Sequence, residues 1–411
     1  MECCVKSLVL GAPAAACTHR SAKSRPTIGR SRILCGSRGA GISPRMVSIA
    51  ATMSSPSWVD ESAAPALGEN RCQAGESLMA YLGSSSGLDE NLAIVILHLQ
   101  GAVKEIAALL ASPEAILSSD STSFSSSPSV APSSGRDAPK PLDIISNELL
   151  KKSLESSRKV AVVASEEEDL PVWINDHGPF VAVFDPLDGS RNIDASIPTG
   201  TIFGIYRRLE EADKLPVEEK AQLNVLQCGS RLVASGYALY SSATILCLTV
   251  GQGTQIFMLD RSCGEFKLVK PDVKVPERGQ IYSVNDARYF DWPQGLRRYI
   301  DDIRRGKGQF PKKYSARYVC SLVADVHRTI LYGGIAMNPR SHLRLVYEGN
   351  PLGFLVEDAG GKACDGKRRI LDIQPVELHQ RLPLFLGSSE DVLELETYGD
   401  VQQVVNPGYE V

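Results

Sequence analysis

The hydrophobic pattern in the first half of the chain predicts helices followed by buried strands. From Leu88 to Leu110, apolar residues recur every three or four positions, which predicts one long amphipathic helix packed on a core. Residues 143–154 show a second helical pattern. The short apolar runs 159–164 and 180–184 are typical of buried strands. This half is therefore expected to contain both helices and a sheet.

The second half begins with strand patterns and ends with mixed elements. β-Branched and aromatic residues alternate with glycine from Thr201 to Tyr206 and from Arg231 to Leu268, which predicts a strand-rich meander. Residues 271–278 are polar and contain proline, so they form a candidate hinge. Beyond the hinge the pattern predicts helices at 295–304, 320–330 and 390–398 and a strand at 343–347.

Composition excludes several classes of protein. The 411 residues, 43% apolar and 22% charged, provide enough material for an ordinary globular core. A formal charge of −4 argues against a nucleic-acid-binding protein. Ten cysteines, five of them in the first 72 positions, are too few to organise the fold by disulfides. No stretch approaches the ~18 uninterrupted apolar residues of a membrane-spanning helix, so no membrane partner is expected.

Two segments stand apart from the folded pattern. Residues 1–59 carry eight Lys and Arg among many Ser, Ala and Gly, with no Asp or Glu after Glu2, a composition typical of an organelle transit peptide. A natively disordered arm is the alternative interpretation of this segment. The second segment, 112–136, is dominated by serine, with ten serines between Ser118 and Gly135, and is expected to be a mobile loop.

Carboxylates follow both of the first two predicted strands. Glu166 and Glu167 come directly after the first strand, and Asp185-Pro186-Leu187-Asp188-Gly189-Ser190 follows the second. Strand ends of this kind are where an open sheet binds ligands. Proline cannot join a ladder, so a turn is expected in which Asp185 and Asp188 converge with the Leu187 carbonyl between them.

These oxygen ligands predict metal-assisted chemistry on a phosphate. They suit Mg²⁺, or Mn²⁺, rather than zinc. Gly189 permits close approach of the backbone, and Ser190 is placed to open a helix whose amides face an anion. Glu166 and Glu167, with Glu348 after the predicted strand 343–347, supply further carboxylates for two ions. Taken singly, a run such as Glu166 to Asp169 is more often a solvated acidic turn, and an acid such as Glu348 is more often a lone surface acid; the Asp185 motif is what favours a shared site.

Histidine and cysteine offer no competing site. The six histidines show no i, i+4 pair, and no cysteines after residue 72 have CxxC spacing, so zinc sites and a Cys/His nucleophile lack candidates.

Several motifs in order resemble the fructose-1,6-bisphosphatase family, within the wider group of Mg²⁺-dependent, lithium-sensitive phosphatases. The resemblance spans about residues 76–398 and implies an α/β layered (α+β sandwich) sugar-phosphatase fold with two mixed or antiparallel sheets between helices. The motifs are Leu142-Asp143-Ile144-Ile145-Ser146-Asn147, Ser165-Glu166-Glu167, Phe184 to Ser190, Asn192-Ile193-Asp194, Gly200 to Tyr206, Ala234 to Tyr240, Ala316-Arg317-Tyr318-Val319, Ala324 to Arg328 and Tyr332 to Ile335.

The resemblance also implies roles for individual residues. It makes metal ligands of Glu166, Asp185, Asp188, Glu348 and the Leu187 carbonyl. Glu167 and Asp143 would handle the attacking water and its proton, and Asp137 would lie on a catalytic loop that the Ser-rich segment extends. Substrate contacts are expected from Gly189, Ser190, Arg191, Asn285, Arg317, Tyr318, Asn338, His342 and Arg344.

The chain departs from the family at the second phosphate site. Asn338 stands where the family has a Tyr and His342 where it has a Lys, and a further Tyr is missing unless Tyr289 substitutes. Arg317 would be lent by a neighbouring subunit. Arg191 replaces a small Ser beside the metal motif, where it would compensate or shift specificity. Each hydrogen bond that a missing Tyr or Lys would have given to the second phosphate is worth ~1.5–3 kcal/mol, so their loss would weaken binding at that site.

The same resemblance indicates which regulatory sites of the family to look for in this chain. The family's AMP site uses a Lys-Tyr pair where Pro179-Phe180 stand, and relatives controlled by thioredoxin carry clustered cysteines where only Cys228 is present. We therefore expect an enzyme that neither AMP nor thioredoxin regulates.

The activity implied is hydrolysis of the 1-phosphate of fructose 1,6-bisphosphate, by a homotetramer or homodimer in the chloroplast stroma. The expected organisation is a transit peptide at 1–59, an N-terminal phosphatase domain at 76–274 and a C-terminal α/β domain at 275–411. A sedoheptulose-1,7-bisphosphatase, another sugar-phosphate phosphatase, or a weakly active sugar-phosphate-binding subunit are the alternatives.

Overall fold

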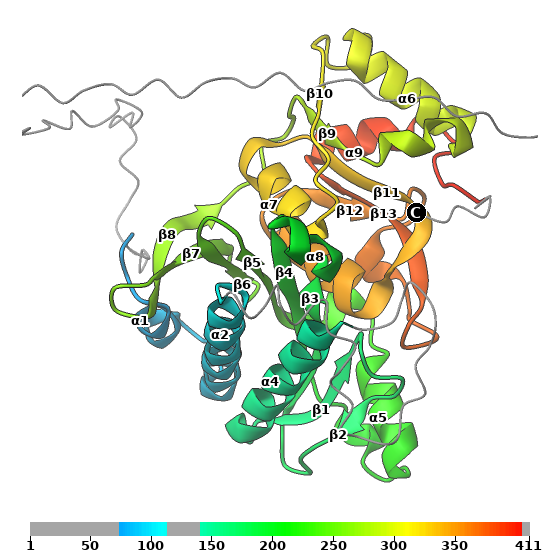
Figure 1. Ribbon diagram of the computed structural model, residues 1–411. Coiled ribbons are helices and arrows are strands. Elements are labelled where there is room, and N and C mark those ends of the chain that lie inside the picture. Colours follow the sequence, from blue (N-terminus) through cyan, green and yellow to red (C-terminus); the bar gives the residue numbers. More distant parts are fainter. Residues whose placement is uncertain (1–73, 113–139, 405–411) are drawn as a thin grey trace, which may run out of the picture. The chain divides into compact units, whose positions relative to one another are not determined.

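The computed structural model describes residues 74–112 and 140–404 (Figure 1), and these residues belong to one compact unit. The expected leader at 1–59 lies outside the described residues, as does the Ser-rich segment apart from Ser112.

The larger sheet of the described chain carries the first carboxylates. It has eight strands in the order β2-β1-β3-β4-β5-β6-β7-β8, of which only β1 and β3 pair in parallel. The strands are Val160–Ser165 (β1), Val172–Trp173 (β2), Phe180–Asp188 (β3), Thr199–Arg207 (β4), Leu232–Tyr240 (β5), Thr244–Thr249 (β6), Thr254–Asp260 (β7) and Glu265–Val273 (β8). The run from β5 to β8 is the predicted meander.

A smaller mixed sheet follows after the connection 274–280, which overlaps the expected hinge. Within the described residues it has five strands in the order β10-β9-β11-β13-β12. The central strand β11 pairs in parallel with β9 and antiparallel with β13, and its ladder with β13 shifts register between Asn338 and Leu343. The strands are Ile281–Ser283 (β9), Ser315–Ala316 (β10), Ile335–Arg344 (β11), Lys362–Cys364 (β12) and Arg381–Gly387 (β13).

Helices separate and cover the two sheets (Figure 1). α2 and α4 cover one face of the larger sheet, α7 and α8 lie between the sheets, and α9 covers the smaller sheet together with α6. The helices are Leu78–Ser84 (α1), Glu90–Leu110 (α2), Pro141–Ser157 (α4), Val217–Val225 (α5), Gln294–Arg305 (α6), Leu322–Tyr332 (α7), Asn350–Asp358 (α8) and Ser389–Glu396 (α9). Short turns of other helix types occur at Ser190–Ala195 (η1), Glu210–Ala212 (η2), Gly229–Arg231 (η3), Asp286–Asp291 (η4), Leu345–Gly349 (η5) and Ile370–Asp372 (η6).

The predicted amphipathic helix is α2. Its residues Leu92, Val95, Leu99 and Val103 are buried in the core that α2 and α4 share with the larger sheet. By length and composition α2 is also the one described helix that would suit a membrane span, a test that buried core helices pass as well.

Two local predictions are wrong. The chain does not turn tightly after Asp185: β3 continues to Asp188, with a register shift against β4 between these two residues. Such an irregularity accommodates Pro186, which has no N–H to give to the ladder. The predicted strand 343–347 ends at Arg344, and the next five residues form the π-helical turn η5. A short buried apolar run does not distinguish a strand from a buried helical segment.

Candidate active site

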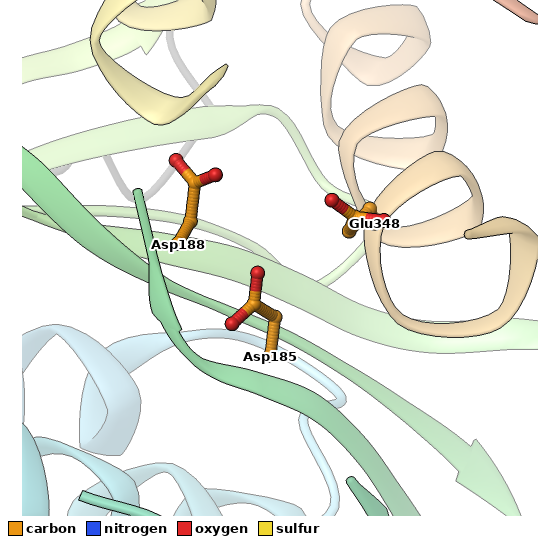
Figure 2. Close-up of side chains that lie close together, drawn as sticks. All are labelled: Asp185, Asp188 and Glu348. Atoms are coloured by element: carbon orange, nitrogen blue, oxygen red, sulfur yellow. The ribbon is translucent and has the colours of Figure 1, made fainter. Parts of the chain in front are cut away.

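Three carboxylates converge at the end of β3. Asp185 and Asp188 come from β3, and Glu348 comes from η5, which directly follows β11 of the other sheet. Ligand oxygens of the three residues lie within 4.8 Å of one another, and Figure 2 shows the side chains turned toward a common centre. The irregular step in β3 allows Asp185 and Asp188, three positions apart, to face the same side.

Burial makes this trio electrostatically costly. The side chains are 2%, 9% and 3% exposed. Burial, and then the neighbouring carboxylates, raise the pKa of Asp185 and Glu348 well above the ordinary range. Burial raises the pKa of Asp188 to about 7, against the Val323 N–H, which donates to its carboxylate at 2.9 Å. Three buried carboxylates this close together fit a divalent metal ion, for which oxygen is the preferred ligand.

Two other predicted ligands lie beside the trio. Leu187 lines the same cavity, and its N–H donates to Asp185 at 3.0 Å. Glu166 also lines the cavity directly after β1, where its N–H donates to the Phe184 carbonyl at 3.2 Å. The carboxylate of Glu166 forms an ion pair with Arg344. Arg344, predicted as a substrate contact, therefore neutralises part of the acidic end of the cavity.

Two acids whose pKa is raised stand next to the trio of Asp185, Asp188 and Glu348. Burial, followed by the charges of Asp143 and Glu166, raises the pKa of Glu167 to about 8. Burial raises the pKa of Asp143 to about 6, partly offset by the Lys140 N–H, which donates to it at 2.7 Å at the start of α4. Acids whose pKa lies near neutrality suit proton transfer. Asp137, expected to share this work, lies outside the described residues.

The segment after β3 is the one expected to present backbone amides to an anion. Gly189 has φ +75°, a left-handed conformation that favours glycine, and η1 begins at Ser190. The Asn192 side chain donates to the Cys320 carbonyl at 2.8 Å and so ties this turn to the residues before α7. Gly189, Ser190 and Arg191 all line the cavity. The predicted helix is real but short and of 3-10 type.

All the predicted site residues that the structure describes line one cavity of about 430 Å³, with the exception of Arg317. Asn285, Tyr318, Asn338 and His342 form its other end. Arg317 is exposed and donates to the neighbouring Ala316 carbonyl, away from this cavity. Tyr289 does not take the place of the missing Tyr, because its hydroxyl donates to Asp301 at 3.0 Å and it is not a lining residue.

Sequence reasoning missed several charged residues in this cavity, chiefly Lys140, Arg288, Asp325 and Arg340. Arg288 lies three residues after Asn285, and Arg340 lies midway between Asn338 and His342. The closeness of Arg288 and Arg340 in sequence to these predicted substrate contacts could have indicated that they also line the cavity.

Comparisons with known proteins agree with this geometry. Two family models, the N-terminal and C-terminal domains of fructose-1-6-bisphosphatase, match residues 84–271 and 275–400. The chain belongs to the fructose-1,6-bisphosphatase family. This membership confirms the predicted family and enzyme class, a phosphoric monoester hydrolase.

Individual members of the fructose-1,6-bisphosphatase family align over most of the described chain. The chloroplastic enzyme of Spinacia oleracea is 44% identical over 329 residues, which span 76% of this chain and 77% of the relative. The chloroplastic enzyme of Brassica napus is 48% identical over 63% of this chain and 67% of its own length. The holo crystal structure of the Leishmania major enzyme superposes with a TM-score of 0.72 at 35% identity, covering 80% of this chain and all of that one. The likeness confirms the predicted layered fold with two sheets.

Proposed function

We propose that this chain hydrolyses the 1-phosphate of fructose 1,6-bisphosphate to give fructose 6-phosphate and inorganic phosphate, with Mg²⁺ as its ion and Mn²⁺ as a substitute. One observation carries the proposal: the buried carboxylates of Asp185, Asp188 and Glu348 line a cavity in a chain that belongs to the fructose-1,6-bisphosphatase family. The relatives named above are fructose-1,6-bisphosphatases, which supports the same substrate.

The protein supplies the remaining groups of the reaction. Asp185, Asp188, Glu348 and the Leu187 carbonyl would hold the ions, with Glu166 beside them. When bound, such ions neutralise the phosphate and lower the pKa of a coordinated water. Glu167 and Asp143 accept and return the proton of the attacking water, and Asp137 assists them. The backbone of Gly189 and Ser190 orients the phosphate that is cleaved.

The proposed setting is a plastid, specifically the stroma, reached through a transit peptide at 1–59. Chloroplastic relatives and the acid-free, Arg-rich leader support it. We also propose the division into a domain at 76–274 that carries the metal site and a domain at 275–411 that completes the substrate site. The larger sheet falls within the first range and the smaller sheet within the second.

The proposed enzyme is a homotetramer or homodimer and is not regulated by AMP or thioredoxin. Arg317 is exposed and outside its own chain's cavity, which suits a residue lent to a neighbour. At the position corresponding to the family's AMP site, Arg207 pairs with Asp89 at 3.1 Å and lies over the Phe180 ring at 5.5 Å. Cys228 is a free thiol. Inhibition by micromolar AMP, or activation by reduced thioredoxin, would contradict this part.

The decisive experiment measures phosphate release by the full-length chain with Mg²⁺ on three substrates side by side. Dominant turnover of fructose 1,6-bisphosphate supports the proposal. Preference for sedoheptulose 1,7-bisphosphate or inositol 1-phosphate assigns another phosphatase activity. No release from any of them favours a sugar-phosphate-binding subunit.

A further inference from the structure

The cavity receives a residue from the last described part of the chain. Gln403 is one of the lining residues and is 4% exposed. It belongs to residues 401–404, which are called the tail segment below. The family model for the C-terminal domain matches residues 275–400, so the tail segment lies outside the match. Its contribution to the cavity is therefore a feature of this chain that family membership does not supply.

The tail segment is firmly packed before it reaches the cavity. Val401 is completely buried in the core that also contains Trp292, a residue that lines the cavity. The side chain of Gln402 donates to the Asp365 carbonyl at 2.7 Å. A buried apolar side chain and a hydrogen bond on successive residues fix the path of the backbone. Gln403 is thus delivered to the cavity by a segment with a defined position.

The tail segment meets β11 where that strand leaves its neighbour. The ladder between β11 and β13 is interrupted between Asn338 and Leu343. Within this interval the N–H of Gln403 donates to the Pro339 carbonyl at 2.7 Å, and a parallel backbone bridge pairs Gln403 with Arg340. Buried backbone groups need partners of this kind when the ladder does not provide them. Gln403 gives this part of β11 a backbone partner that β13 does not.

The interval that Gln403 contacts is a wall of the cavity. Every residue from Ala336 to Arg344 except Ser341 lines it. Two of these residues, Asn338 and His342, are predicted substrate contacts. Binding groups that are displaced by about 1 Å lose much of their effect on a bound substrate. The position of residues 339–342 therefore decides how well a sugar phosphate fits.

We propose that Gln403 is a positioning residue of the substrate site, which holds residues 339–342 of β11 and thereby sets the KM of the enzyme. The inference rests on the proposed function for its substrate. β11 rejoins β13 at Leu343, before η5 and its Glu348 begin, and Asp185 and Asp188 belong to β3. Loosening residues 339–342 should therefore leave the metal trio in place and impair substrate binding more than turnover.

The test compares the full-length wild type with two shortened chains. The chain that ends at Gln402 keeps the buried Val401 and the bond to Asp365 but lacks the N–H of Gln403. The chain that ends at Val404 keeps the whole tail segment and is the matched control. Ending at Gln402 should raise KM for fructose 1,6-bisphosphate ~5- to 30-fold and change kcat less than ~2-fold. The control should match the wild type in both constants.

Two further measurements separate this inference from the proposed function. Hydrogen exchange of peptides from residues 335–345, read by mass spectrometry, should be faster in the chain that ends at Gln402 than in the control, whether or not either turns over substrate. If the wild type releases no phosphate, calorimetry with fructose 6-phosphate decides, and weaker binding by the chain that ends at Gln402 supports the inference. The same exchange in both shortened chains, the same KM, or equal or absent binding of fructose 6-phosphate would overturn it.

Discussion

Removing one charge from the metal trio should stabilise the metal-free protein while destroying its response to Mg²⁺. The substitution is Asp188→Asn, which keeps an oxygen to accept the Val323 N–H. At the 4.8 Å limit of the trio, two like charges repel by about 3 to 4 kcal/mol at an effective dielectric constant of ~20. Burial of the charge, and then the charges of Glu166 and Asp325, raise the pKa of Asp188 to about 7, so proton uptake by Asp188 relieves both the cost of burial and the repulsion.

The pH dependence fixes the sign of the effect. The pKa of Asp188 is higher in the folded protein than in the unfolded chain, where it is near 3.8, so the folded protein binds more protons between these values. The contribution of Asp188 to wild-type stability therefore falls as pH rises from about 4 through 7. Three pKa units correspond to about 4 kcal/mol, and sharing of protons among the three acids reduces this to about 2–4 kcal/mol above pH 7.

The assay is thermal unfolding at pH 8 and pH 5, each with EDTA and with Mg²⁺. For a protein of this size D188N should unfold about 3–6 °C higher than the wild type in EDTA at pH 8, and the gain should shrink at pH 5. Mg²⁺ should raise the Tm of the wild type and have little effect on the variant. Glu219→Gln, at an exposed acid on α5, should behave as wild type. If D188N were no more stable than the wild type in EDTA, or if Mg²⁺ stabilised both equally, the reasoning would be refuted.

Three further predictions concern separate parts of the molecule. Glu167→Gln should reduce kcat at least ~100-fold with an unchanged circular dichroism spectrum, and an unchanged rate would remove Glu167 from proton transfer. Burial lowers the pKa of His327 to about 4, so the unfolded chain takes up this proton first, and the contribution of His327 to stability should fall by about 2 kcal/mol between pH 7 and 5, opposite in sign to that of Asp188. The difference in urea-unfolding free energy between the wild type and His327→Gln should change by this amount between the two pH values. Gly236→Ala would place its Cβ 2.5 Å from the Cys247 carbonyl oxygen and should lower the free energy of unfolding by ~1–3 kcal/mol or more. Gly101→Ala lies inside α2 with free space around the new Cβ and should raise the free energy of unfolding by ~0.5–1 kcal/mol. Thermal unfolding of both variants beside the wild type checks the two signs.

Much of the fold followed from periodicity because the core elements have strong, uninterrupted patterns. α2 and the strands β1 and β3 were predicted within a few residues, and so was the position of Glu166 and Asp185 toward the C-terminal ends of two buried strands. The segment that carries Glu348 was assigned to a strand, because an apolar run that is buried on all sides has no period to reveal its conformation.

The positions of Arg288 and Arg340 in the cavity could not be predicted from sequence patterns. Arg340 faces the cavity because of a register shift in β11, and such a shift depends on the partner strand and on the contact with Gln403. Arg288 is a buried cation in a short helical turn, a position that hydrophobic patterning assigns to the surface. The role proposed for Arg317 requires a second subunit, which one chain's sequence does not describe.

The origin of the metal trio in two distant parts of the chain has a consequence for biosynthesis. The meander of the larger sheet is built from neighbouring hairpins and can form early, as local contacts do. The acidic end of β3 in the same sheet, however, stays incomplete until the turn carrying Glu348 has been made and has docked beside it. A chain that stops before that turn would thus acquire most of a sheet but no complete binding site for the ion, so the enzyme becomes competent only in the last stage of its own synthesis and folding.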